Sequence, residues 1–438
     1  MSGSKRDKVL IVGAGCFGIS TAYHLLERGY QDVTVIDRSD ILPAPDAAST
    51  DLNKIVRSSY SDHFYARLAQ EAIQAWKAPH WQDTYQECGV LVLGSISHED
   101  KNAYMIKAYE NDKTLGCRTE FYPDPNAIRS AFSNNVPISS LDDYFAYLNR
   151  DGGWASSAQG VKIMIDMVRA KGGSVITGKG ATKLLRKDGK TSGVKCADGT
   201  TYDADLVVLA AGSWTASAFS DLNLHGKCFA TGQSVATIQL SREGAAVYRD
   251  CPVIWDLVSE FYMFPPNQDN IVKLGIHGPG YTHIPTASAG PSISTPRTVA
   301  SHDKEGLRIP KEMVQELRNH LAKFYPELAK EPFASTRLCW YCEQADEDWV
   351  IGHYPSDPSL VMATGGSGHA YKFLPVIGSV VADAIEGKLD LTLMKKFALD
   401  RECRENNISR AGVVPGALNV ADLCSPEDLQ PSSSHFAL

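Results

Sequence analysis

The sequence predicts an α/β fold, in which a Rossmann-type domain is joined to an α+β domain built on an antiparallel sheet. Three observations predict it. Residues 8–37 have the pattern of a strand, a glycine-rich turn, a helix and a second strand. A strand, a glycine-rich turn and a helix recur near the other end of the chain, at 359–380. Residues 225–330 are rich in short strands, so we expect the first domain to be discontinuous.

The unit at 8–37 has the spacing of a dinucleotide site. Gly13 permits the tight turn after the strand, Gly15 lets the backbone approach a pyrophosphate at the helix N-terminus, and Gly18 allows the helix to pack closely on the strand. Asp37 stands where a carboxylate accepts hydrogen bonds from the adenosine ribose. Because this acid disfavours a ribose 2′-phosphate, the unit predicts FAD or NAD and leaves the choice between them open.

The segment 182–214 favours FAD. Turn signals stand at Asp188-Gly189 and Asp198-Gly199, and the apolar strand that follows runs onto Ala211-Gly212. Small residues at the end of a strand place backbone against a flat ligand, with no side chain in the way. FAD-binding two-domain oxidases need a hairpin that leads back to a parallel strand in this way, whereas NAD dehydrogenases have no common need for it.

Composition excludes some classes of partner. The net charge of −8 over 438 residues gives no basic field, so we expect no nucleic acid partner. No apolar run approaches the roughly 18 residues of a membrane span. The N-terminus has no signal-type apolar region, so we expect an intracellular protein that binds no membrane. Ten scattered cysteines without a framework pattern predict reduced thiols.

Periodicity predicts helices at 63–77, 163–171 and 311–325, and strands at 89–94, 172–177, 234–240, 253–256, 261–264 and 271–275. We expect an FAD-binding domain formed by residues 1–85, 150–225 and 330–400. A substrate domain formed by 86–149 and 226–329 would cover the cofactor. Residues 401–438 would form a C-terminal extension, of which we expect 425–438 to be disordered.

Two segments carry candidate site residues. The loop after the second strand leads to Asn53, Lys54 and Arg57, whose cations would face a flavin or an anionic substrate. Residue types alone favour a competing interpretation, a solvated helix start, because Lys and Arg are mostly exposed. Strand alternation at 273–277 places Lys273 and His277 on one face.

Together the motifs GAGCFG, DGGW, ADLVVLAAG, CWYC and GGSGHAYKFLPVIG resemble the monomeric sarcosine oxidase family of FAD amine oxidases, over residues 8–390. That family includes pipecolate and saccharopine oxidases and the fungal fructosyl amino acid oxidases, or amadoriases. The resemblance implies a D-amino-acid-oxidase-like fold, FAD as cofactor, an amino acid derivative and oxygen as substrates, and hydrogen peroxide as a product.

The resemblance also implies that the flavin is bonded covalently to Cys339. The alternative interpretation of Cys339 and Cys342 is a CxxC redox or zinc pair. A second CxxC and a nearby His pattern are both missing from the sequence, so we expect no metal.

Further roles follow from the same resemblance. Lys273 matches a lysine that activates oxygen beside the flavin, where its charge stabilises superoxide. Lys372 and Arg57 match the pair that holds the substrate carboxylate, which suits a guanidinium fork. His277 matches an active-site histidine four residues after the lysine. The residues expected to bind the cofactor are Gly13, Ala14, Gly15, Phe17, Gly18, Asp37, Arg38, Asn53, Lys54, Gly212, Cys339, Gly368 and Lys372.

Two departures bear on the substrate. Fructosyl amino acid oxidases carry an acidic residue where this chain has His277, which argues against a fructosyl substrate. The DGGW turn and Asp51-Leu52-Asn53-Lys54-Ile55 resemble the fungal branch, whereas bacterial enzymes have arginine in place of Lys54. We therefore expect oxidation of the secondary amine of an N-substituted or cyclic α-amino acid, of the saccharopine, pipecolate, sarcosine or fructosyl type, to an imine that hydrolyses.

Three alternatives stay open: a dedicated fructosyl amino acid oxidase, an NAD-linked imino or amino acid dehydrogenase, and a non-catalytic flavin-binding protein. We expect a monomer or a weak homo-oligomer. Members of the family often end in a Ser-Lys-Leu-like peroxisomal signal, from which Phe436-Ala437-Leu438 departs, so both cytoplasm and peroxisome fit the sequence.

Overall fold

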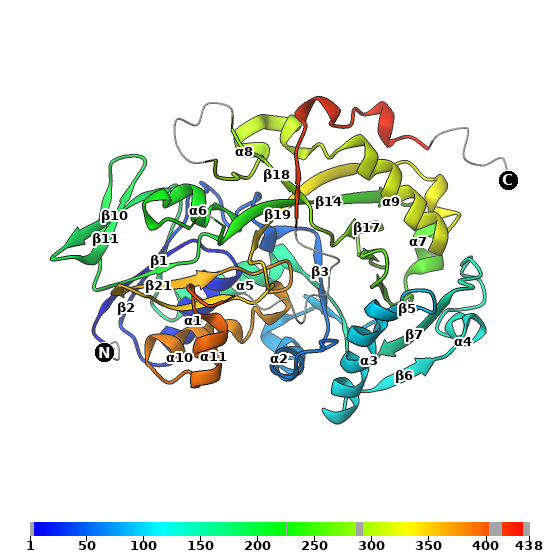
Figure 1. Ribbon diagram of the computed structural model, residues 1–438, viewed down its shortest axis with the longest axis horizontal. Helices are drawn as coiled ribbons and strands as arrows, with labels where there is room; N and C mark the ends of the chain where they lie inside the picture. The colour runs from blue at the N-terminus through cyan, green and yellow to red at the C-terminus, as the bar shows by residue number, and fades with distance from the viewer. Residues whose placement is uncertain (1–3, 225, 286–291, 403–413, 432–438) are drawn as a thin grey trace.

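The computed structural model describes residues 4–224, 226–285, 292–402 and 414–431 (Figure 1). A six-stranded sheet has the order β20-β21-β13-β1-β2-β9. Its strands are β1 (Lys8–Val12), β2 (Asp32–Ile36), β9 (Ser174–Ile176), β13 (Leu206–Leu209), β20 (Val350–Tyr354) and β21 (Asp357–Thr364). Every neighbouring pair except β20–β21 is parallel, as crossover connections require.

β1 lies inside this sheet because it is apolar on both faces. Val9 and Ile11 pack on one side against helices, and Leu10 and Val12 pack on the other against a three-stranded sheet. The helices are α1 (Cys16–Glu27), α5 (Ser157–Ala170) and α10 (Ile377–Ile385), and the three strands are β10 (Ala181–Lys187), β11 (Lys190–Cys196) and β12 (Thr201–Asp203).

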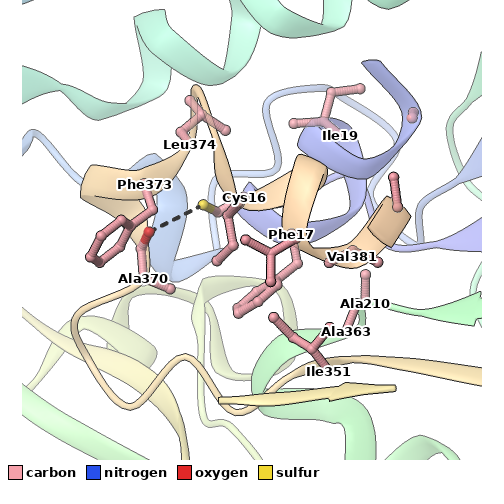
Figure 2. Close-up of a cluster of buried hydrophobic side chains, with 14 of the residues drawn as sticks. Cys16, Phe17, Ile19, Ala210, Ile351, Ala363, Ala370, Phe373, Leu374 and Val381 are labelled. Atoms are coloured by element: carbon pink, nitrogen blue, oxygen red, sulfur yellow. Dashed lines mark hydrogen bonds between the residues drawn. The ribbon is translucent and has the colours of Figure 1, made fainter. Parts of the chain in front are cut away.

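The two ends of the chain meet in this domain. Figure 2 shows Phe17 of α1 lying among Ile351, Ala363 and Val381, which belong to β20, β21 and α10. Beside it the Cys16 thiol donates to the carbonyl of Ala370 over 3.7 Å. The late glycine-rich turn is therefore held directly beside the first one.

A ten-stranded sheet has the order β22-β18-β14-β17-β16-β15-β5-β7-β6, with β19 also paired to β14. Its strands are β5 (Val90–Ser95), β6 (Thr119–Tyr122), β7 (Tyr144–Asn149), β14 (Phe229–Gln239), β15 (Val253–Asp256), β16 (Phe261–Met263), β17 (Ile271–Ile276), β18 (Tyr281–Thr282), β19 (Ser335–Glu343) and β22 (Gly416–Ala417). The amphipathic helix α9 (Lys311–Phe324) covers one face and buries Leu317 and Leu321 there (Figure 1).

This sheet is mixed, whereas the sequence predicts an antiparallel one. Most pairs are antiparallel, but β5 and β15 run parallel, as do β18 and β22. The strands of each parallel pair come from segments far apart in the chain, so no hairpin turn fixes their direction.

The remaining elements connect the layers. They are α2 (His63–Trp76), α3 (Glu99–Thr114), α4 (Pro125–Arg129), α6 (Thr215–Ala218), α7 (Arg242–Tyr248), α8 (Val299–His302), α11 (Leu391–Phe397) and a sheet with the order β3 (Asn53–Val56), β8 (Gly153–Ser156), β4 (Tyr85–Gln86). The Asp62 carboxylate caps α2 by accepting from the Tyr65 amide at 3.2 Å.

The structure departs from the sequence predictions at three further places. α5 begins before the predicted 163–171, because Ser156–Ser157 turns directly into it. β19 lies in the segment 330–400 that we assign to the cofactor domain, yet it pairs with β14 of the other sheet along its whole length. The tail prediction is wrong for residues 425–431, since Leu429 accepts from the Phe333 amide and from Arg318. Residues 432–438, with the C-terminal Phe436-Ala437-Leu438, lie outside the described residues.

All nine cysteines in the described ranges are free thiols. None of the helices in those ranges combines the length and the apolar character that crossing a bilayer takes. The part of the chain that the structure describes also groups no three His, Cys, Asp or Glu side chains that could hold a metal.

Candidate active site

A cavity of about 350 Å³ lies at the carboxyl ends of β1 and β13, where α/β sheets bind ligands. The residues of the predicted cofactor set that line it are Gly13, Gly15, Phe17, Asp37, Arg38, Lys54, Gly212 and Gly368. The predicted residues outside its lining are Ala14, Gly18, Asn53, Cys339 and Lys372. Residues from the first strand–turn–helix unit, from the segment after β13 and from the late glycine-rich turn thus line one cavity.

The backbone at this cavity fits a pyrophosphate. A Cβ on Gly13, whose φ is +107°, would lie 2.4 Å from the carbonyl oxygen of Ala210. Gly15 is the N-cap residue of α1 and provides no side-chain cap, so the first amides of the helix are available to an anion. These features fit the diphosphate of FAD.

Two predicted nucleotide contacts are already engaged within the protein. The Asp37 carboxylate accepts from the amides of Ala14 at 2.8 Å and Ser39 at 2.9 Å. Its oxygens keep free lone pairs, so the ribose contact stays a prediction. The Arg38 guanidinium lies 3.9 Å from the centre of a Trp214 ring, and both side chains line the cavity. The side-chain amide of Asn53 is buried, and neither its Nδ2 nor its Oδ1 has a hydrogen-bond partner among the described residues.

Gly18→Ala is expected to lower the free energy of unfolding by about 3 kcal/mol and to reduce FAD content, because overpacking at a close contact forces the backbone apart. The added Cβ would lie 1.8 Å from the carbonyl oxygen of Gly13. Denaturant unfolding and the flavin-to-protein absorbance ratio measure both effects. Gly244→Ala on α7 is the control, since its Cβ would meet nothing closer than 3.4 Å. Equal stability of the two variants would contradict this account.

A second cavity, of about 60 Å³, brings the predicted reaction residues together. Arg57, Lys273, His277 and Lys372 all line it, and Lys54 and Gly368 line both cavities. Its apolar wall consists of Ile55, Trp255, Tyr262, Phe264, Tyr341 and Tyr371. Four cationic side chains, those of Lys54, Arg57, Lys273 and Lys372, thus line this space, and its lining includes no carboxylate. This arrangement favours an anionic ligand.

Arg57 and Lys372 approach this inner cavity from neighbouring segments. The Arg57 guanidinium lies 3.7 Å from the centre of a Trp255 ring and donates to the carbonyl of Ser59. Lys372 donates to the Tyr60 hydroxyl at 2.8 Å and to the His369 carbonyl at 2.7 Å. Burial and the charge of Arg57 lower the pKa of Lys372 well below its usual value. A carboxylate bound between the two side chains would stabilise both charges.

His369 extends this network. Its Nε2 lies 2.9 Å from the carbonyl oxygen of Glu347, which can only accept, so Nε2 carries the proton. Its Nδ1 then accepts from the Tyr60 hydroxyl at 3.1 Å. Tyr60 therefore accepts from Lys372 and donates to His369, which fixes Lys372 in place.

Behind the inner cavity lies a buried ion cluster centred on Asp51. Its carboxylate lies 2.5 Å from Lys273, 3.1 Å from Lys54 and 4.0 Å from Arg337. Burial alone would raise the pKa of Asp51, but the three cations outweigh it and hold this pKa far below its usual value. Burial, reinforced by Lys54 and opposed by Asp51, lowers the pKa of Lys273 to about 8.

The predicted flavin-linking Cys339 stands at the edge of this cluster. It is fully buried, and its Sγ lies 3.4 Å from Lys54 Nζ. Cys339 and Tyr341 share one face of β19, whereas Cys342 points to the other face and lines the larger cavity. Of the CxxC pair, Cys342 therefore lines the cofactor cavity directly, whereas Cys339 contacts Lys54, which lines that cavity.

Sequence reasoning missed Asp51, His369 and the aromatic wall. The signal for Asp51 was available, because an acid three residues before Lys54 is well placed to pair with it. No signal distinguishes Trp255 or Tyr262, since aromatic residues in strands are usually ordinary core.

Comparisons with known proteins agree with this geometry. The family model described as FAD dependent oxidoreductase matches residues 8–384. L-saccharopine oxidase of Schizosaccharomyces pombe is 32% identical over 405 residues, which cover 87% of this chain and 90% of that protein. Monomeric sarcosine oxidase of a Bacillus species is 23% identical, over 92% of this chain and 98% of that protein.

Among solved structures, the fructosamine oxidase of Aspergillus fumigatus (Amadoriase II) superposes with a TM-score of 0.83 at 26% identity. The superposition covers 97% of this chain and 98% of that one. The predicted fold class is thereby confirmed.

Proposed function

Because the chain belongs to the FAD-dependent oxidoreductase family, we propose that it oxidises the secondary amine of an N-substituted or cyclic α-amino acid. The observation that carries the proposal is the inner cavity, where Arg57 and Lys372 flank a space with four cations and no lining carboxylate. FAD is the cofactor; held in the cavity that Gly13, Gly15 and Gly212 line, it would supply the two-electron oxidation of the CH–NH unit to an imine, with the two electrons and two protons passed on to oxygen as hydrogen peroxide.

The protein's own residues bind and orient the substrate. Arg57 and Lys372 hold the carboxylate, and the rings of Trp255 and Tyr262 exclude water from the reacting carbon. His277 lines the same space and would accept the proton of the amine before its oxidation, since an imidazole is the most common general base of enzymes.

Room for the N-substituent lies next to the carboxylate site. A third cavity, of about 930 Å³, shares Arg57 and His369 with the inner one. The inner cavity, at about 60 Å³, is much smaller than an engineered cavity of about 150 Å³ that binds benzene, so it has room for little more than the reacting atoms. A substrate with a long substituent would therefore extend from the inner cavity past Arg57. The name of the saccharopine oxidase relative supports such a substrate.

The test is oxygen consumption by the purified holoenzyme with four substrates: N-methylglycine, pipecolate, saccharopine and a fructosyl amino acid. We expect a secondary amine to be oxidised with one hydrogen peroxide per oxygen consumed, and fructosyl substrates to react poorly because His277 replaces an acidic residue. Oxidation of the fructosyl substrate alone would favour the amadoriase alternative, which the structural neighbours support.

We also infer that the flavin is attached covalently through Cys339. The supporting observation is that the sulfur of Cys339 lies 3.4 Å from Nζ of Lys54, a residue that lines both the cofactor cavity and the inner cavity. After acid denaturation, yellow absorbance should stay on the wild-type chain and leave the Cys339→Ala chain. Cys342→Ala is the matched control, because the thiol of Cys342 lines the cofactor cavity. Retention in Cys339→Ala with loss in Cys342→Ala would assign the bond to the other thiol.

A further inference from the structure

Asp51 is close to the reaction site but does not line any of its cavities. The residue is 4% exposed and is absent from the linings of both the cofactor cavity and the inner cavity. Its position is fixed by the backbone: its carbonyl accepts from the Ser157 hydroxyl, and its Oδ1 accepts from the Leu52 amide at 2.8 Å. It can therefore influence the reaction only through the side chains that it contacts.

The most important of these contacts is with Lys273. An ammonium has three donors. One is directed to Asp51 at 2.5 Å and a second to the carbonyl of Asn53 at 2.7 Å. The third is left for the inner cavity, which Lys273 lines although its side chain is only 1% exposed. Two acceptors, one on Asp51 just before β3 and one on Asn53 at the start of β3, thus determine where the remaining donor points.

The charges around Lys273 make the carboxylate necessary. Lys54 and Arg337 belong to the same cluster, and both repel a further positive charge. Tyr262, Phe264 and Cys339 are also neighbours of Lys273, and the two ring centres lie 6.0 and 5.0 Å from its Nζ. Asp51 is the carboxylate in ion-pair contact with Lys273 among the described residues. Without it, Lys273, Lys54 and Arg337 would form a cluster of three cations with no compensating carboxylate.

We propose that Asp51 is the positioning residue of the oxygen reaction: it orients Lys273 and keeps its ammonium charged beside Lys54. The proposal rests on the proposed oxidase function for its kinetic consequence. Its electrostatic content, that Asp51 supports the charge of Lys273, is a property of the protein alone and can be measured separately.

The separate measurement is an NMR titration of protein labelled with ¹³C at the lysine ε-carbon, with the Lys273 signal assigned through Lys273→Met. Since the pKa of Lys273 is about 8 in the wild type, its signal should titrate near that pH. In Asp51→Asn the titration should move down by about one to three pH units, as for loss of an adjacent opposite charge. Asp51→Glu should return the titration of Lys273 most of the way to its wild-type pH. An unchanged titration in Asp51→Asn would overturn the proposal.

A second variant covers the case in which Asp51→Asn does not fold. Arg337→Gln removes a cation from the far side of Asp51 and should move the Lys273 titration to higher pH. Arg308→Gln is the control, because its guanidinium pairs with Glu305 at 2.7 Å, outside this cluster. Titration at the same pH in Arg337→Gln and Arg308→Gln would also contradict the proposal.

The kinetic readout uses the holoenzyme. Reoxidation by oxygen in Asp51→Asn should slow down at lower pH than in the wild type. At pH 8 the deficit should be about fivefold for a shift of one pH unit and about fiftyfold for two, whereas reduction by the substrate should keep its pH profile. A purely structural role would lower both half-reactions at every pH. If no amine reduces the enzyme, the proposed function fails, while the NMR result still decides the role of Asp51.

Discussion

Lys273→Met is expected to slow the reaction of the reduced enzyme with oxygen by about 10²–10³-fold, which corresponds to about 3–4 kcal/mol of activation free energy. The reason is that superoxide is an anion, and Lys273 presents a fixed charge with a free donor to the inner cavity. Methionine keeps the length of the side chain and removes the charge. Reduction of the enzyme by its substrate should change little, because Arg57 and Lys372 still hold the carboxylate.

Stopped-flow absorbance measures the two half-reactions separately: anaerobic mixing with the amine, then mixing of the reduced enzyme with oxygenated buffer. In the wild type, the second rate should fall as pH rises through about 8, because the lowered pKa of Lys273 means that its charge is lost there. The Lys273→Met variant should show no such dependence. Lys162→Met, which removes an exposed cation paired with Asp166 at 2.9 Å and outside all three cavities, is the control. Equal losses in both half-reactions would rule out an oxygen role for Lys273.

Arg57→Met should lower kcat/KM for an N-substituted amino acid by about 10²–10³-fold, since breaking a buried, charge-assisted pair costs about 3–5 kcal/mol. Arg57→Lys should recover only part of this loss, because an ammonium cannot form the two parallel bonds of a guanidinium. Steady-state oxygen consumption measures the effect.

The control for Arg57 is the methyl ester of the same substrate, which carries no carboxylate. The wild type should strongly prefer the acid over the ester, and Arg57→Met should lose this preference. A variant that loses activity equally on acid and ester would show that Arg57 acts through the shape of the pocket, because its ring contacts with Trp255 and Tyr60 would then matter more than its charge.

Local patterns predict the cofactor domain well. The turn at Gly13, Gly15 and Gly18 depends on neighbouring residues, and so does the apolar strand β13, so a short stretch of sequence determines each of them. The placement of β19 does not follow from local pattern. The pattern of residues 335–343 does not specify a partner strand, and tertiary packing against β14 decides the pairing.

The reaction site also combines features that the sequence indicates with contacts that only tertiary packing sets. Lys273 and Arg57 were identified from resemblance and residue type, and the structure brings both to one cavity. The contact between Lys273 and Asp51 joins two segments far apart in the chain, so neither periodicity nor spacing signals it. The direction of the remaining Lys273 donor depends on the Asn53 carbonyl, a backbone group that the sequence does not specify.

The measurement that tests the central claim most directly is a single turnover without and then with oxygen. Anaerobic addition of a secondary-amine amino acid should bleach the yellow holoenzyme, and admission of oxygen should restore its colour with one hydrogen peroxide and one hydrolysed imine per flavin. The corresponding primary amino acid should leave the colour unchanged. A holoenzyme that no secondary amine bleaches, or one whose substrate oxidation requires added NAD, would contradict the account.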